Sequence, residues 1–255
     1  MMFLMVAAAS SLVPTGNWVV DYADRQCVAS RRFDNGGKPL TLAIKPSPTS
    51  DVVQLNLLRP GREISGVQTE TEIVLGNASP LKLRELSFGT RTAHVRQINL
   101  TSNQAASLAS ATALGWNSSN EKLSLVTGSL GPVIKALATC RADLRDYWNI
   151  TPERRKKLKA PAKSAQSLVA LFSTNDYPSQ AIMQEQSGMT SVVLLIDEAG
   201  KAVECMIDGT SGIAVLDAKT CIIVRSRGKF TAAIGEDGKP VRSHFVTRIR
   251  WELGK

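Results

Sequence analysis

Short apolar and β-branched runs alternate with turn residues through the first part of the chain. Within these runs, polar and apolar residues tend to alternate, which is the period of a half-buried strand, and residues such as Pro46, Pro60-Gly61 and Gly76 separate them. The pattern predicts strands at residues 18–22, 27–31, 40–44, 52–58, 71–75, 94–100 and 123–126. It therefore indicates a β-rich domain, which we assign to residues 17–148.

Two segments of this domain have helical spacing instead. One is residues 103–113, and the other runs from Pro132, a residue that suits the first turn of a helix, to about Trp148. The apolar positions of the second helix are Val133, Leu137, Cys140 and Leu144. The β-rich domain therefore ends in a helix that has a cysteine on its buried side.

The pattern changes in residues 169–255, where turn residues divide the sequence into strand, strand, helix and strand. The sequence Asp197-Glu198-Ala199-Gly200 is typical of a hairpin turn, and Gly228 suits a helix end. The predicted elements are strands at 190–196 and 201–207, a helix at 215–227 and a long last strand at 241–253. The fold class is therefore α+β, with a β-rich N-terminal domain that ends in a helix, followed by a small β-β-α-β domain.

Charge is concentrated between these two domains. The chain has a formal net charge of +9, and residues 149–168 hold six Lys or Arg against one Glu, whereas residues 169–255 hold ten of each sign. A nucleic-acid-binding domain spreads basic side chains over a folded face together with aromatic residues, so we expect no nucleic-acid partner. Residues 149–168 are predicted to be a basic linker. Its charge either keeps the chain soluble, which is the simpler interpretation, or contacts anionic membrane headgroups.

The chain begins with an apolar run, residues 1–13, that is too short to span a bilayer. Its length and the small residues within it are typical of a secretory signal peptide, although no Lys or Arg precedes the run. We therefore predict a signal peptide at residues 1–16 and export from the cytoplasm. The alternative is an ordinary first strand or helix of the fold.

The four cysteines are too far apart for a zinc site, because they include no CxxC pair and the chain has only two histidines. Two lie in each predicted domain, which suits one disulfide per domain in an oxidising compartment. The alternative is four buried thiols in a cytosolic protein. Cys205 on the second strand faces Cys221 on the helix, and Cys140 can reach Cys27 on an early strand. The predicted disulfides are Cys205–Cys221 and, as a hypothesis, Cys27–Cys140.

Several short motifs follow one another in a fixed order along the last domain. They are Tyr177-Pro178 with Ala181, Gly188, Cys205, Ser211-Gly212, Leu216-Asp217, Cys221, Arg227 with Phe230, the turn Asp237-Gly238-Lys239-Pro240-Val241, and Trp251. In this order they resemble the TonB C-terminal domain family, in its exported, cysteine-containing variant. Thr210 and Ala232 depart from the family's usual loop residues, which are serine and proline.

This resemblance implies a non-enzymatic, periplasmic, TonB-like protein that takes part in transport and needs no cofactor. Its edge strand would pair with a peptide of an outer-membrane TonB-dependent transporter or another envelope protein. The strand expected to pair runs from Phe245 to Trp251. The expected partner-binding residues are Phe245, Thr247, Arg248, Ile249, Arg250 and Trp251. Alternatively, Arg248 and Arg250 protect an edge strand from aggregation.

A second function remains open. Energy transducers of the family carry an N-terminal membrane anchor and a Pro-rich spacer, and in their place this sequence has the β-rich domain. The alternative is therefore an exported interaction or scaffold protein that uses the fold without energy coupling. An enzyme is not expected, because Ser211 and His244 come without a GxSxG motif and residues 128–131 lack a phosphate-binding pattern.

Overall fold

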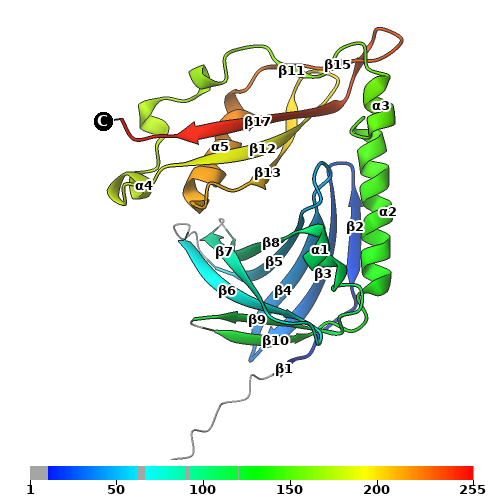
Figure 1. Cartoon of the computed structure of the whole chain (residues 1–255), viewed down its shortest axis with the longest axis vertical. Coiled ribbons are helices and arrows are strands. Elements are labelled where there is room, and N and C mark those ends of the chain that lie inside the picture. Colours follow the sequence, from blue (N-terminus) through cyan, green and yellow to red (C-terminus); the bar gives the residue numbers. More distant parts are fainter. Residues whose placement is uncertain (1–10, 62–66, 90–91, 120, 255) are drawn as a thin grey trace, which may run out of the picture.

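The computed structural model describes residues 11–61, 67–89, 92–119 and 121–254. Figure 1 shows a curved sheet with helix α2 (Gly131–Tyr147) along one side, and a smaller sheet packed above the curved one. The chain is α+β and consists mostly of strands, as predicted. Within the described ranges, no helix has the length and apolar character that a membrane crossing requires.

A ten-stranded sheet makes up the N-terminal part of the described chain. Its strands are β1 (Ser11–Leu12), β2 (Val19–Ala23), β3 (Gln26–Asn35), β4 (Lys38–Pro46), β5 (Val53–Pro60), β6 (Val67–Leu75), β7 (Leu81–Gly89), β8 (Ala93–Leu100), β9 (Ala113–Ser118) and β10 (Lys122–Val126). They lie in the order β1-β10-β9-β6-β7-β8-β5-β4-β3-β2. Neighbours are antiparallel, apart from β1 and β10, which are parallel.

Residues 11–15 connect the two ends of this sheet and close it into a barrel. They belong to the signal peptide predicted at residues 1–16, so for them the structure fits the alternative of an ordinary first strand; residues 1–10 lie outside the described residues. After β1 pairs with β10, the chain reaches β3 through a bridge between Pro14 and Phe33. The Thr15 N–H then donates to the Arg32 carbonyl over 3.0 Å. Closure matters because an open sheet would leave two rows of unpaired backbone groups exposed.

Alternate residues of the strands fill the barrel with apolar side chains, among them Leu42, Leu57 and Ile98. Helix α2 packs on β3, where Cys140 forms a disulfide with Cys27, and its apolar side chains belong to the same hydrophobic cluster as those of the barrel. This bridge ties the end of the N-terminal part to its beginning. The Cys27–Cys140 hypothesis is confirmed.

The structure differs from the helix predicted at residues 103–113. Helix α1 covers only Ser102–Ala106, and strand β9 begins at Ala113. Leu114 and Trp116 of β9 are both fully buried, two residues apart, which places them on the same face of a strand but on different sides of a helix. Both residues follow the predicted helix, and strand β9 was not predicted. Within residues 107–111, turn hydrogen bonds from the Leu108 N–H to the Ala105 carbonyl and from the Ala111 N–H to the Leu108 carbonyl replace the helical pattern.

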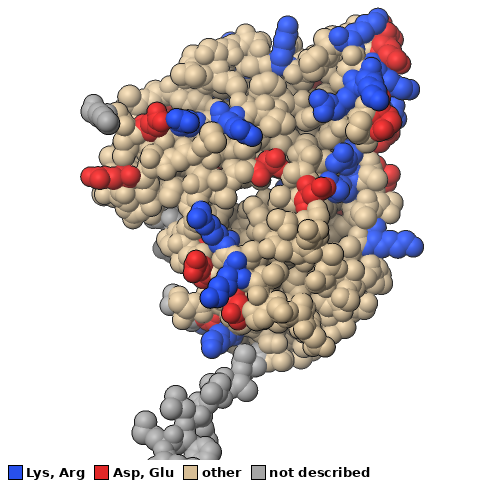
Figure 2. All heavy atoms as spheres, viewed as in Figure 1, with Lys and Arg blue, Asp and Glu red and all other residues tan. Residues whose placement is uncertain are grey.

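The basic segment, residues 149–168, connects the two parts and also packs on the second. It contains α3 (Pro152–Lys156) and β11 (Lys163–Ser164), and β11 pairs with β14 (Phe230–Thr231). Ala162 is buried in the C-terminal core. Lys and Arg side chains gather on the surface around α3 (Figure 2). The segment thus exposes its charge on one side and contributes packing on the other.

The C-terminal part is built on a three-stranded antiparallel sheet. Strand β12 (Gly188–Ile196) lies in the centre, between β13 (Ala202–Gly209) and β17 (Ser243–Trp251). Helix α5 (Ala214–Arg227) packs on β12 and β13, and the Cys205–Cys221 disulfide joins it to β13, as predicted. The short elements around this sheet are η1 (Val169–Leu171), η2 (Thr174–Asp176), α4 (Ser179–Met183) and the paired strands β15 (Ala233–Ile234) and β16 (Pro240–Val241).

Both faces of β12 are buried. Val192 and Leu194 belong to the core beneath α5, whereas Val193 and Leu195 belong to the hydrophobic cluster of the barrel. The barrel therefore covers the second face of the C-terminal sheet, as the stacking of the two sheets in Figure 1 indicates.

The two disulfides should differ in how much they stabilise the protein. Cys27 and Cys140 are 113 residues apart and Cys205 and Cys221 only 16. In the chain-entropy model the longer loop gives about 5 kcal/mol and the shorter about 3 kcal/mol. We expect the Cys27→Ala/Cys140→Ala variant to lose more thermal stability than Cys205→Ala/Cys221→Ala. Calorimetry of both double variants checks this, and a larger loss for the second pair would contradict it.

Candidate functional site

The C-terminal sheet has two edges, and the barrel occupies one of them. The free side of β13 faces the barrel, where the Val203 carbonyl accepts from the Arg25 side chain and the Ile207 carbonyl from Gln54, each over 3.5 Å. Among the described residues, the backbone of β17 pairs with β12 alone. The outer edge of β17 is therefore the edge that remains open for pairing.

Side chains of β17 alternate between the two faces of the sheet. Ile249 and Trp251 are buried toward α5, while Val246, Arg248 and Arg250 are exposed on the opposite face. Trp251 is anchored by its indole N–H, which donates to Thr220 Oγ1 on α5 over 2.9 Å. The strand thus presents basic groups along one face and is held in place by the other.

An aromatic cluster surrounds the end of β17. The rings of Phe172 and Tyr177 both meet Trp251 edge to face, with centroids 5.4 and 5.3 Å away. The Tyr177 hydroxyl donates to the Gln186 carbonyl over 2.6 Å, and burial, with the nearby Glu252, raises the pKa of the Tyr177 phenol. Edge-to-face pairs of this kind add about 0.5–1.5 kcal/mol each to the gain from burial. They fix residues 172–177 against the strand.

Asp176 fastens the same segment to helix α5. Its carboxylate accepts two hydrogen bonds from Arg227, at 2.6 and 2.9 Å, and further ones from the Ser173 N–H and hydroxyl. The Arg227 guanidinium, together with these Ser173 groups, holds the pKa of Asp176 well below its usual range. The bidentate pair therefore sets the position of the wall that faces β17.

Between this wall and β17 lies an apolar groove with a volume of about 550 Å³. Leu168, Val169 and Phe172 line one side, and Ile249 and Trp251 line the other. A volume of this size lies within the range of protein binding sites. The open edge and the groove together form the candidate site.

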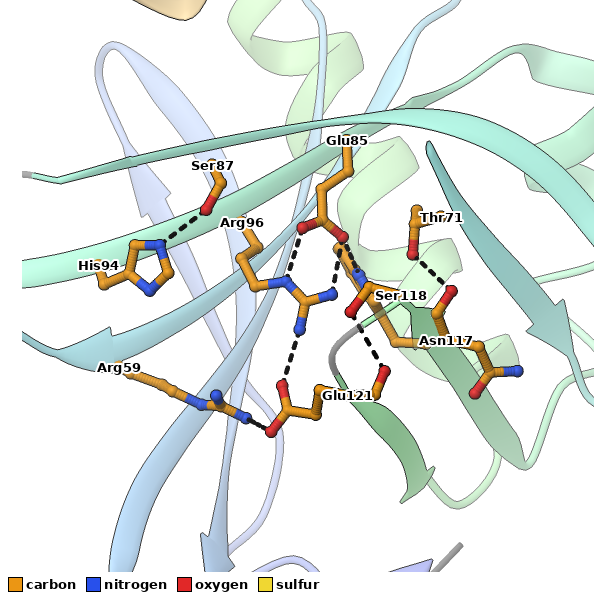
Figure 3. Close-up of polar contacts among 10 residues, drawn as sticks. Arg59, Thr71, Glu85, Ser87, His94, Arg96, Asn117, Ser118 and Glu121 are labelled. Atoms are coloured by element: carbon orange, nitrogen blue, oxygen red, sulfur yellow. Dashed lines mark hydrogen bonds and ion pairs between the residues drawn. The ribbon is translucent and has the colours of Figure 1, made fainter. Parts of the chain in front are cut away.

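A second cluster of polar residues lies at one mouth of the barrel (Figure 3). Arg96 donates to both oxygens of Glu85, over 2.7 and 2.8 Å, and to Glu121 over 2.8 Å. Glu85 also accepts from the Trp116 indole over 2.6 Å, and Glu121 accepts from Arg59 over 2.6 Å. Two positive and two negative charges thus satisfy one another, which meets the condition for burying them.

Ser87 and His94 form a further pair at this mouth, with 2.7 Å between the hydroxyl and Nε2 (Figure 3). Burial, Arg96 and Arg59 lower the pKa of His94, which favours the neutral form of its imidazole. Both residues lie beside the ion pairs of Arg96 and Arg59, whose charges are satisfied within the cluster. We therefore interpret the mouth as a polar closure of the apolar interior.

The family model described as Gram-negative bacterial TonB protein C-terminal matches residues 173–253. These residues are a TonB C-terminal domain. The match begins at Ser173, which binds Asp176, and ends just after β17, so it includes the edge and part of the groove wall. The searches of curated proteins and of solved structures yield no match.

The structure brings the predicted partner-binding residues of this TonB C-terminal domain onto one strand, in two sets. Phe245 packs beside Phe230, and Ile249 and Trp251 are largely buried, so these side chains hold the strand in the sheet. Arg248 and Arg250 are exposed, and Thr247 is half-buried. A role of all six residues in binding stays a prediction.

Sequence patterns missed the groove wall and the barrel mouth. The apolar run from Leu168 to Phe172 can be read from the sequence. That it forms a groove wall follows only from the contact of Phe172 with Trp251 in the structure. At the barrel mouth, Glu85 of β7 and Arg96 of β8 point into the barrel, at positions where an apolar side chain is usual. Charged residues at positions where the strand alternation predicts burial were the sequence signal that could have revealed this cluster.

The ion pairs at the barrel mouth predict an asymmetric effect of mutation. Glu85→Leu should destabilise the protein by about 3–5 kcal/mol, because it leaves the buried Arg96 with only Glu121 as an ion-pair partner. Asp146→Ala is the control, because it removes an exposed ion pair with Arg154 that water screens, and it should cost far less stability than Glu85→Leu. Urea denaturation measures both, and equal losses would contradict the interpretation.

Asp176 predicts how the stability of the TonB C-terminal domain depends on pH. Its pKa is lower in the folded than in the unfolded protein, so its stabilising contribution is complete above roughly pH 4 and is lost as the pH falls further. Asp176→Asn should therefore be less stable than the wild type at pH 7, and the gap should close toward pH 2. Thermal unfolding at several pH values checks this, and a gap that stays constant would contradict it.

Proposed function

We propose that this protein works in the periplasm and binds an outer-membrane TonB-dependent transporter by adding a peptide strand of that transporter to the open edge of β17. The single observation that carries the proposal is that a TonB C-terminal domain has one edge, that of β17, left unpaired among the described residues. In such β-augmentation the backbone supplies affinity and alternate side chains supply selectivity. The consequence for the cell would be transport across the outer membrane.

The second edge of the sheet supports this choice of strand. A partner strand at β13 would have to displace Arg25 and Gln54 of the barrel, which already contact its carbonyls. A partner at β17 displaces no hydrogen bond made by the backbone of that strand to another described residue. Pairing at β17 therefore costs less reorganisation of the protein.

The two disulfides support a compartment outside the cytoplasm. Neither pair lies in a CxxC motif, and both join buried or half-buried positions of a strand and a helix, which is typical of structural bridges. Structural disulfides persist in oxidising compartments such as the periplasm. The basic surface around α3 is suited to contact anionic headgroups of an adjacent membrane.

The barrel favours a second candidate function, an exported scaffold protein that binds envelope partners without energy coupling. It buries the face of the TonB sheet that Val193 and Leu195 occupy, so the domain acts together with the barrel rather than alone. Both candidates use the edge of β17. They differ in whether the partner is a transporter.

Proline substitutions test pairing at β17 directly. In an edge strand, the N–H groups of successive residues point alternately to the neighbouring strand and to solvent. Of the two variants Thr247→Pro and Arg248→Pro, one therefore removes an N–H that bonds to β12, and the other removes an N–H that points to solvent. The other variant should keep its fold, as judged by circular dichroism and melting temperature. We expect this folded variant to recover less than about a tenth of the transporter that wild type recovers from outer-membrane extract.

Thr247→Ser and Arg248→Lys are the controls, because they keep both N–H groups and the charge. They should recover the transporter as the wild type does. Undiminished recovery by the folded proline variant would contradict edge pairing. Recovery of other envelope proteins but never of a TonB-dependent transporter would support the scaffold function instead.

A further inference from the structure

Several apolar side chains at the rim of the groove beside β17 are exposed to solvent. Val169 is 82% exposed and Ile182 is 47% exposed, although both line the groove. A contiguous apolar surface of this kind marks a place where another molecule binds. The groove follows the outer edge of β17 from Arg248 to the end of the strand and continues to Gly254, so that Arg248 and Arg250 also line it beside the apolar side chains.

The groove is held in its shape before any partner arrives. Its far wall is fixed to α5 by the Asp176–Arg227 pair and to the strand by the contacts of Phe172 and Tyr177 with Trp251. A preformed site avoids the entropy cost of ordering a loop on binding. An occupant therefore gains most of the free energy of its own apolar burial.

The geometry of the edge determines which side chains of an added strand meet this groove. A strand paired with β17 lies about 4.8 Å from it and sends successive side chains to opposite faces of the sheet. Those on the face of Ile249 and Trp251 enter the apolar groove. Those on the other face lie beside Arg248 and Arg250, within about 5.5 Å in a cross-strand pair.

The charges on that second face are available to a partner. Arg248 has no ion-pair partner among the described residues. Arg250 pairs with Glu252 at 3.1 Å, but both side chains are about two-thirds exposed, so this pair contributes little and a second carboxylate can share the guanidinium. Carboxylates of the added strand thus meet two basic side chains in succession.

We propose that the occupant of the β17 edge is an extended peptide segment in which apolar and acidic residues alternate. The apolar set fills the groove and the acidic set pairs with Arg248 and Arg250. This inference rests on the edge pairing proposed above and adds the chemistry of the partner. A second copy of the chain is a poorer occupant, because its β17 presents basic side chains and no carboxylate to Arg248 and Arg250.

Synthetic peptides test the pattern on the full-length, oxidised protein. Three eight-residue peptides labelled with fluorescein are compared by fluorescence polarisation: one alternates Leu and Glu, one alternates Leu and Lys, and one has the Leu and Glu residues in two blocks. We expect the alternating Leu-Glu peptide to bind at least about tenfold more tightly than the other two, because only it places both sets of side chains correctly.

Substitutions in the protein identify the contacts. Arg248→Glu/Arg250→Glu should reverse the preference, so that the Leu-Lys peptide binds more tightly than the Leu-Glu peptide. Val169→Asp should weaken the Leu-Glu peptide by about tenfold, since it places a charge in the groove. Ile222→Asp is the matched control: Ile222 is also exposed and apolar, but it lies on α5 outside the groove, and its variant should bind as the wild type does.

The outcomes separate this inference from the proposed function. Equal binding of the three peptides, or binding unaffected by Val169→Asp and by the charge reversal, overturns the alternating pattern. If the wild type recovers the transporter while no peptide binds, the pattern is also overturned and edge pairing stands. If the peptides bind as expected but no transporter is recovered, the pattern is supported and the transporter as partner is rejected.

Discussion

The residues of β12 pack alternately into two hydrophobic cores. Val192 and Leu194 lie beneath α5, and Val193 and Leu195 lie against the barrel. A strand buried on both faces cannot shift its register by one residue without exchanging the two sets of side chains. The register of β17 on β12, and with it the position of the open edge and the groove, therefore depends on the docking of the barrel.

The barrel also determines which surfaces of the TonB C-terminal domain are exposed. It covers one face of the sheet and contacts the outer carbonyls of β13 through Arg25 and Gln54. Helix α5 covers the other face. Among the described residues, the strand edge of this sheet that remains uncovered is that of β17, and the N-terminal part contributes no residue to the groove beside it.

Local patterns were sufficient where a local interaction determines the structure. The hairpin turn at residues 197–200 appears as predicted, because the Asp197 carboxylate accepts from the Ala199 and Lys201 N–H groups and Gly200 adopts a positive φ. The motifs of the last domain likewise found its family. Each of these depends on residues that are close in sequence.

Long-range packing limited prediction elsewhere. Strand β9 was not predicted, because the burial of Leu114 and Trp116 depends on its pairing with the distant strand β6 in the barrel. Strand β7 has Glu85 at an inward position, which only the distant Arg96 and Trp116 make possible. The groove depends on residues 168–177 meeting Trp251, a contact across most of the C-terminal domain. A pattern of neighbouring residues contains none of these pairings.

The connectivity of the disulfides has a consequence for the order in which the protein matures. Four cysteines allow three pairings, and here each cysteine joins the next one along the chain, Cys27 to Cys140 and Cys205 to Cys221. In a chain that emerges with its N-terminus first, Cys27 and Cys140 are present together before Cys205 and Cys221 appear. The correct pairing is then also the earliest one, so maturation requires little reshuffling by a disulfide isomerase.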